Sequence, residues 1–169
     1  MDKSHFLSLA KEGEVNLRFA ESCLHEEQLS CVLIIHLVCE RIIERWTEST
    51  SNNKNIFDNV RGLSFSAKLQ IAKNFELPEF FSVFCKTLNK IRNGFAHEIS
   101  KKYIDDEEIN KLESCMTLLP KEAVGRDVKT NTIKIKGVPH KYSEATVNIK
   151  LVCMFGLVYS NLLTYVNEK

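Results

Sequence analysis

The amino-acid sequence predicts an all-α protein, an antiparallel bundle of four long helices and one or two short ones, folded as a single domain over residues 1–169. Apolar residues recur at three- and four-residue spacing along most of the chain. Only three prolines and six glycines occur, so long disordered stretches are not expected. Hydrophobic residues make up 44% of the chain and charged residues 27%, which is typical of a soluble globular protein.

The first two predicted helices cover residues 4–23 and 26–47. Ser4 is a suitable cap for the first of them. The second is apolar around most of its circumference, as expected for a helix that lies at the centre of a bundle or in an interface. The polar run from Ser49 to Asn55 then predicts a loop, and a short helix is expected over residues 66–75.

The next predicted helix runs from Pro78 to His97 and has the clearest helical period in the chain. Proline suits the first position of a helix, because the amide at that position has no partner within the helix. The apolar residues of this helix step by three and four: Phe81, Phe84, Leu88, Ile91 and Phe95.

A helix and a segment of different character follow. Asp105 and Glu108 have the spacing of a capping box, which predicts a helix that ends before Pro120. Between residues 126 and 139, isoleucines alternate with polar residues. This pattern indicates either a small β-ribbon or an irregular loop.

The last predicted helix is capped by Ser143 and ends near Val166. Its stretch from Leu151 onward is the most apolar part of the sequence, but it contains Ser160 and Asn161. A membrane span needs about 20 apolar residues. We therefore expect a buried core helix and no membrane partner.

Charge and cysteine content give weaker indications. The net charge of +1 does not argue for or against a polyanionic partner, since a local patch matters more than the sum. Residues 121–150 are mildly basic, which we interpret as a solvated loop. The six cysteines include no C-x-x-C pair, and the N-terminus has no signal-peptide core. We expect buried thiols and a reducing, cytoplasmic location.

Polar side chains gather at the end of the helix over residues 78–97. Asn93 and His97 are four residues apart and so share one helical face, toward which Arg92 can swing its guanidinium. Gly94 in a helix costs about 1 kcal/mol relative to alanine. Close approach by a neighbouring chain is one reason for a glycine at this position.

This segment resembles the motif of the HEPN superfamily, an arginine and a histidine separated by four to six residues with a polar residue directly after the arginine. Arg92, Asn93 and His97 occupy those three positions. The run Asn-Gly-Phe-Ala-His is also similar to mannitol-repressor-like proteins, a branch with a related helical fold. The resemblance is sharp over these residues and extends, as an order of helices, from about Leu29 to the C-terminus.

The resemblance implies a metal-independent endoribonuclease of a toxin–antitoxin or antiphage defence system. Two copies would form a homodimer with one shared cleft, without a cofactor, in which the RNA 2′-hydroxyl attacks its own phosphate. His97 would transfer protons. Arg92 would hold the phosphate, and Asn93 would orient the ribose or the imidazole. Glu40 would support Arg92, since in HEPN-like proteins an acid of the second helix often faces the motif arginine.

The same residues also allow a non-catalytic interpretation. Arg92 could pair with Glu40, and Asn93 and His97 could bond backbone groups at the helix end. The protein would then be a regulatory or protein-interaction module of mannitol-repressor type, or an antitoxin-like or nucleotide-binding partner in a larger system. Glu40 could instead form a solvent-exposed pair on its own helix. His36 is expected to be a satisfied core histidine, since it has too few neighbouring ligands for a metal site.

Overall fold

The structure is a computed structural model that describes residues 1–9, 27–58, 60, 62–123, 126–135 and 137–168. It confirms a mostly helical fold with one small β-ribbon. The helices are α1 (Lys3–Ser8), α3 (Gln28–Ser51), α4 (Phe65–Asn74), α5 (Glu79–His97), α6 (Asp106–Cys115) and α7 (Val147–Glu168). The strands are β1 (Thr132–Ile135) and β2 (Val138–Lys141), and short 3-10 turns cover Met116–Leu118, Val128–Thr130 and Tyr142–Glu144.

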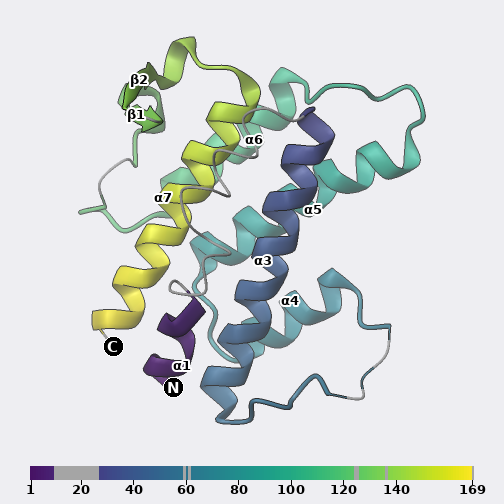
Figure 1. The fold of residues 1–169 in the computed structure, drawn as a ribbon, viewed down its shortest axis with the longest axis vertical. Helices are drawn as coiled ribbons and strands as arrows, with labels where there is room; N and C mark the ends of the chain where they lie inside the picture. The colour runs from purple at the N-terminus through teal and green to yellow at the C-terminus, as the bar shows by residue number, and fades with distance from the viewer. Residues whose placement is uncertain (10–26, 59, 61, 124–125, 136, 169) are drawn as a thin grey trace.

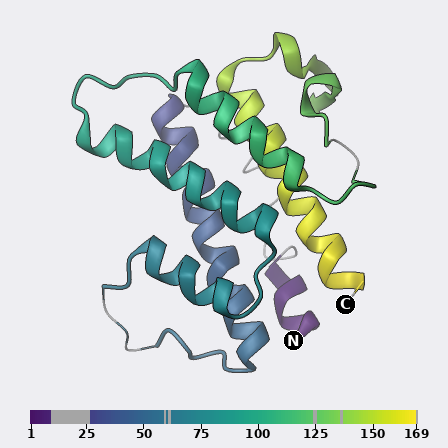
Figure 2. The ribbon, with the colours of Figure 1, turned by 180° about the vertical axis from the view of Figure 1, so that it is seen from behind.

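Helix α3 is the central element and packs against α4, α5 and α7 (Figure 1). It runs antiparallel to α5, because His36 near its middle bonds Asn89 while Gln28 at its start accepts from the amide of Ile104, beyond the end of α5. Helix α6 lies beside α5 and packs over α7, as the reverse view shows (Figure 2). The described chain ends lie close together, and the Lys3 ammonium donates to the Asn167 carbonyl at 3.4 Å.

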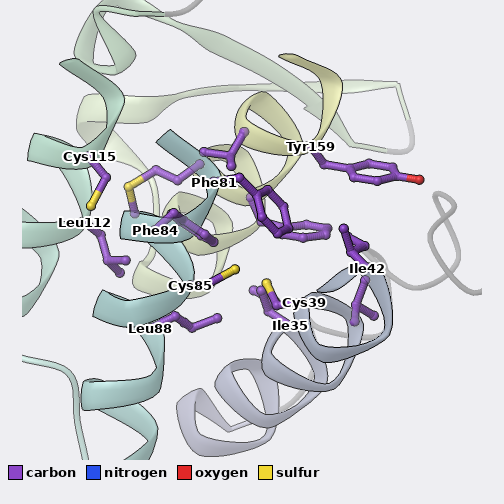
Figure 3. Packing of buried hydrophobic residues seen from close by; sticks show 14 of the residues in the cluster. Ile35, Cys39, Ile42, Phe81, Phe84, Cys85, Leu88, Leu112, Cys115 and Tyr159 are labelled. Atoms are coloured by element: carbon purple, nitrogen blue, oxygen red, sulfur yellow. The ribbon is translucent and has the colours of Figure 1, made fainter. Parts of the chain in front are cut away.

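The core is formed where α3, α5, α6 and α7 meet (Figure 3). Helix α5 contributes most of its large apolar side chains to this region, because their spacing by three and four places them on one face. The labelled side chains in this view are Ile35, Cys39, Ile42, Phe81, Phe84, Cys85, Leu88, Leu112, Cys115 and Tyr159.

The cysteines of the described residues are buried and free, as predicted. Burial raises the pKa of the Cys153 thiol to about 11 and raises the pKa of Cys85 as well. Because desolvation disfavours the thiolate, these side chains act as small apolar groups in the core. Cys23 lies outside the described residues.

The N-terminal boundaries differ from the prediction. Helix α1 is capped by Asp2, whose carboxylate accepts from the amide of His5 at 3.0 Å, and not by Ser4. The rest of the predicted helix over residues 4–23 lies outside the described residues, apart from Leu9. Helix α3 continues to Ser51, and Asn52 ends it with a left-handed φ of 53°.

The predicted loop after α3 therefore begins three residues later than expected. The hydroxyl of Thr50 donates to the carbonyl of Trp46 at 2.7 Å, and that of Ser51 donates to Glu48 at 3.3 Å. These polar side chains bond back into the helix, so they do not break it.

The caps of the middle helices follow from their sequences. Ser64 caps α4. Asp105 and Glu108 form the predicted capping box, with bonds of 2.8 and 3.2 Å. Pro78 is the N-cap of α5, one position earlier than predicted. Of the two alternatives for residues 126–139, the structure shows the ribbon, which turns at Gly137 with a φ of 80°.

The final helix starts at Val147, so the prediction that Ser143 caps it is wrong. Tyr142 is 1% exposed and its hydroxyl donates to a Glu113 carboxylate oxygen at 3.0 Å. This anchor holds residues 142–144 in a 3-10 turn, and the helix begins only after Thr146.

Helix α7 is long and apolar enough, by length and composition, to cross a membrane, but half of its most apolar window is buried inside the fold. Core helices of soluble proteins meet the same criterion. Leu151, Val158 and Leu162 are completely buried, and α7 contacts both α3 and α5. This placement agrees with the prediction of a core helix.

Candidate functional site

The three motif residues lie on the last two turns of α5, and we call them the α5 polar cluster: Arg92, Asn93 and His97. Arg92 and Asn93 are half-buried, and His97, the last residue of the helix, is exposed. The Arg92 guanidinium donates to the Asn93 side-chain oxygen at 3.2 Å, so it swings toward the amide as the sequence predicts. The cluster is therefore open to solvent, and its groups are not sealed within the bundle.

The adjoining apolar side of α5 fixes the cluster in place. Ile91 is 2% exposed, and Phe95 packs against the core. A side chain at Gly94 would place its Cβ 3.3 Å from the Lys101 side chain. Lys101 also donates to Glu108 at 2.7 Å and lies 5.6 Å from the centre of the Phe95 ring. The close approach at Gly94 is thus made within the chain itself, by a lysine that holds the following loop against the helix, whereas the sequence suggested a neighbouring chain.

His36 is a buried core histidine whose ring is hydrogen-bonded within the protein, as predicted. It is 7% exposed, its Nε2 bonds the Asn89 side-chain oxygen at 2.9 Å, and its ring lies 4.1 Å from that of Phe65. Burial lowers the pKa of His36, and the nearby positive charge of Arg92 acts in the same direction, against the opposing effects of Asn89 and Glu40. The imidazole is therefore kept neutral near neutral pH.

This lowered pKa predicts acid sensitivity. Below about pH 6.5 the unfolded chain binds a proton at His36 that the folded protein resists, so the stability contributed by the neutral ring is lost as pH falls. We expect the unfolding free energy, measured in urea, to fall more between pH 7.5 and pH 5 for the wild type than for His36→Gln. The glutamine keeps an amide donor toward Asn89. Equal pH dependence in the two proteins would contradict this assignment.

Glu40 does not support Arg92 in this structure. It pairs with Lys68 of α4 at 2.7 Å, and Glu44 pairs with the same ammonium at 2.6 Å. Burial lowers the pKa of Lys68, but these two carboxylates outweigh it and leave the pKa raised. Both earlier expectations for Glu40, a bond to Arg92 or a pair on its own helix, are thus replaced by a link between α3 and α4.

The Lys68 pairing was missed at the sequence level, although one signal was present. Glu40 and Glu44 are four residues apart on α3 and so point to the same side. Their charges repel each other, and a cation between them would relieve this repulsion. Their capture by Lys68 leaves Arg92 without an ion pair among the described residues. The guanidinium therefore has charge and donors to offer a ligand.

The fold and the site together define a helical-bundle protein with a solvent-accessible arginine–asparagine–histidine cluster at a helix end. No protein-family model, no curated protein and no solved structure matches this chain. In the part of the chain that the structure describes, no three His, Cys, Asp or Glu side chains gather where they could hold a metal ion.

Proposed function

We propose that this protein is a HEPN-type endoribonuclease that works without a metal ion as a homodimer. The observation that carries the proposal is the open α5 polar cluster, in which an unpaired Arg92 guanidinium bonds Asn93 and His97 is exposed. A structural role for these residues would bury them against protein partners. The non-catalytic alternative of mannitol-repressor type gains no comparable support from these contacts.

The chemistry needs two proton transfers and no redox step. An imidazole removes the proton of the 2′-hydroxyl as that oxygen bonds to the adjacent phosphorus. The bond from phosphorus to the 5′-oxygen breaks, and an imidazolium gives that oxygen a proton. The products are a 2′,3′-cyclic phosphate and a 5′-hydroxyl. Arg92 stabilises the charge that develops on the phosphate oxygens. Asn93 orients the Arg92 side chain and the ribose.

A second copy of the chain supplies the second imidazole, since each cluster contains one histidine. The surface for that copy lies on α3, the helix that packs against α5. Leu29, Leu33 and Leu37 recur every four residues there and are 36%, 37% and 63% exposed. An apolar stripe left open on a central helix is a typical contact surface between subunits.

We expect the double variant Leu33→Glu, Leu37→Glu to be monomeric and to lose RNA cleavage, because charges on both subunits would be buried in the same contact. Sedimentation velocity gives the oligomeric state and gel electrophoresis gives the cleavage. The control is Leu118→Glu, which changes a leucine that is 42% exposed in the turn Met116–Leu118, outside α3. A wild type that is monomeric at all concentrations, or a double variant that still dimerises, would refute the dimer.

The activity is tested by incubating purified protein with total RNA, with and without a chelator. We expect cleavage in both samples and 2′,3′-cyclic phosphate ends. An oligonucleotide that carries 2′-deoxyribose throughout should remain intact, because it lacks the nucleophile. If varied RNAs stay uncut at high protein concentration, the ribonuclease proposal is wrong. In the cell we propose that this activity belongs to a toxin or a defence component, so expression of the active form should arrest growth.

A further inference from the structure

We infer that the face formed by α4 and α5 is a track for the phosphate backbone of single-stranded RNA, leading to His97. The inference deepens the proposed ribonuclease function and rests on it, because it gives the substrate a path to the α5 polar cluster. Helix α4 contains no acidic residue, and the only one in α5 is Glu79, at its first position. Long helical surfaces usually mix both signs of charge, so this face is strongly biased.

The exposed side of α5 places two lysines in line with two residues of the α5 polar cluster. Lys86, Lys90, Asn93 and His97 occupy positions i, i+4, i+7 and i+11, so they lie on one helical face. Lys86 and Lys90 are both exposed. At 1.5 Å per residue the line is about 16 Å long. A polyanion bound along this line would pass Lys86 and Lys90 and reach His97.

A groove of about 250 Å³ between α4 and α5 continues the line away from His97. Lys73 of α4 and Lys86 of α5 both line it. Hydroxyl and amide groups lie between them, including Ser66 and Asn89, which bond each other at 3.4 Å. Lysine ammonium groups and amide donors are the side chains that proteins use to hold phosphate and sugar oxygens without reading the bases.

Three lysines of this face are unpaired, whereas Lys68 of α4 and several lysines elsewhere are neutralised by neighbouring carboxylates. Lys73, Lys86 and Lys90 form no ion pair within the described residues. By contrast, Lys129 pairs with Glu113 at 3.1 Å, within the mildly basic segment 121–150. The other paired lysines include Lys68, Lys101, Lys111 and Lys141. Unpaired cations carry counterions that a bound polyanion would release, which favours binding.

A nucleic-acid strand fits this face better than an anionic membrane surface does. Helices that lie on membranes insert large apolar side chains beside their cations. None of the exposed large apolar side chains of the described residues lies on α4 or α5. No aromatic side chain is exposed there to stack on bases, so binding through this face should depend on the phosphates and be tolerant of sequence.

The test measures binding of a fluorescent single-stranded RNA by anisotropy, in a His97→Ala background so that the RNA stays intact. Adding Lys86→Gln and Lys90→Gln should weaken binding about tenfold and lower the slope of log affinity against log salt by about 1.4, since two phosphate contacts are lost. The matched control is Lys121→Gln with Lys134→Gln, which removes the same charge from exposed positions outside α4 and α5. It should change neither quantity.

Equal affinity and equal salt slope in the Lys86/Lys90 and control variants would overturn the track, even if the wild type cleaves RNA. Failure of the wild type to cleave, with binding that still depends on Lys86 and Lys90, would refute the ribonuclease and leave the track standing. Vesicles rich in phosphatidylserine form the second arm. Lysine-dependent binding to vesicles without binding to RNA would overturn the assignment in favour of a membrane surface.

Discussion

The His97→Ala variant is expected to cleave RNA about 10²- to 10⁴-fold more slowly than the wild type, the usual loss when a general acid or base is removed. Its unfolding free energy should stay within about 0.5 kcal/mol of the wild type, because the side chain of His97 is exposed. The rate is measured on a short RNA, and stability by urea denaturation of the same preparations.

The matched control for this substitution is His140→Ala, which removes a histidine from β2, far along the chain from the α5 polar cluster. It should leave the cleavage rate unchanged. The reverse pattern, in which His97→Ala lowers the unfolding midpoint and leaves activity intact, would show that the motif is a packing device. The regulatory alternative would then replace the nuclease.

The Trp46→Ala variant is expected to lose about 3–5 kcal/mol of stability, the range for removing a large buried aromatic side chain. Trp46 is 1% exposed, and its indole donates to the carbonyl of Phe75 at 2.9 Å. Its ring also meets Phe6 edge-on at 5.7 Å and lies 6.3 Å from Tyr165. One side chain thus joins α1, α3, the end of α4 and α7.

Such a loss is a large share of the roughly 5–15 kcal/mol that stabilises a typical domain. Urea denaturation followed by circular dichroism would measure it. The control is Tyr103→Ala, which removes an aromatic side chain that is 71% exposed and should change stability by no more than about 0.5 kcal/mol. A Trp46→Ala protein as stable as this control would mean that the packing around Trp46 is not as described.

The sequence predicted helices well where side-chain period and capping chemistry agree. The capping box at Asp105 and the apolar line along α5 are local features, so their outcome does not depend on distant residues. The prediction failed where contacts between residues far apart in the sequence determine where a helix begins. Ser143 has the chemistry of a cap, but the bond of Tyr142 to Glu113, 29 residues away, keeps that segment out of the helix.

The candidate site likewise has features that the sequence predicts and features that it does not. The shared face of Asn93 and His97 follows from helical spacing alone, and the structure places Arg92 beside Asn93 as expected. The partner of Glu40 could not be read from the sequence, because several cations were available and only the packing of α4 on α3 brings Lys68 within 2.7 Å. The unpaired state of Arg92 is a consequence of that packing.

By itself, the sequence determined the helical class, the places where most helices begin, and the polar cluster at the end of α5, since each depends on residues within a few positions of one another. Only the tertiary structure decided that this cluster is open, that Glu40 pairs with Lys68, and that α4 and α5 join into one face that carries three unpaired lysines. Those properties depend on which side chains meet across the bundle, and burial and ion pairing between distant segments are set by the packing of whole helices.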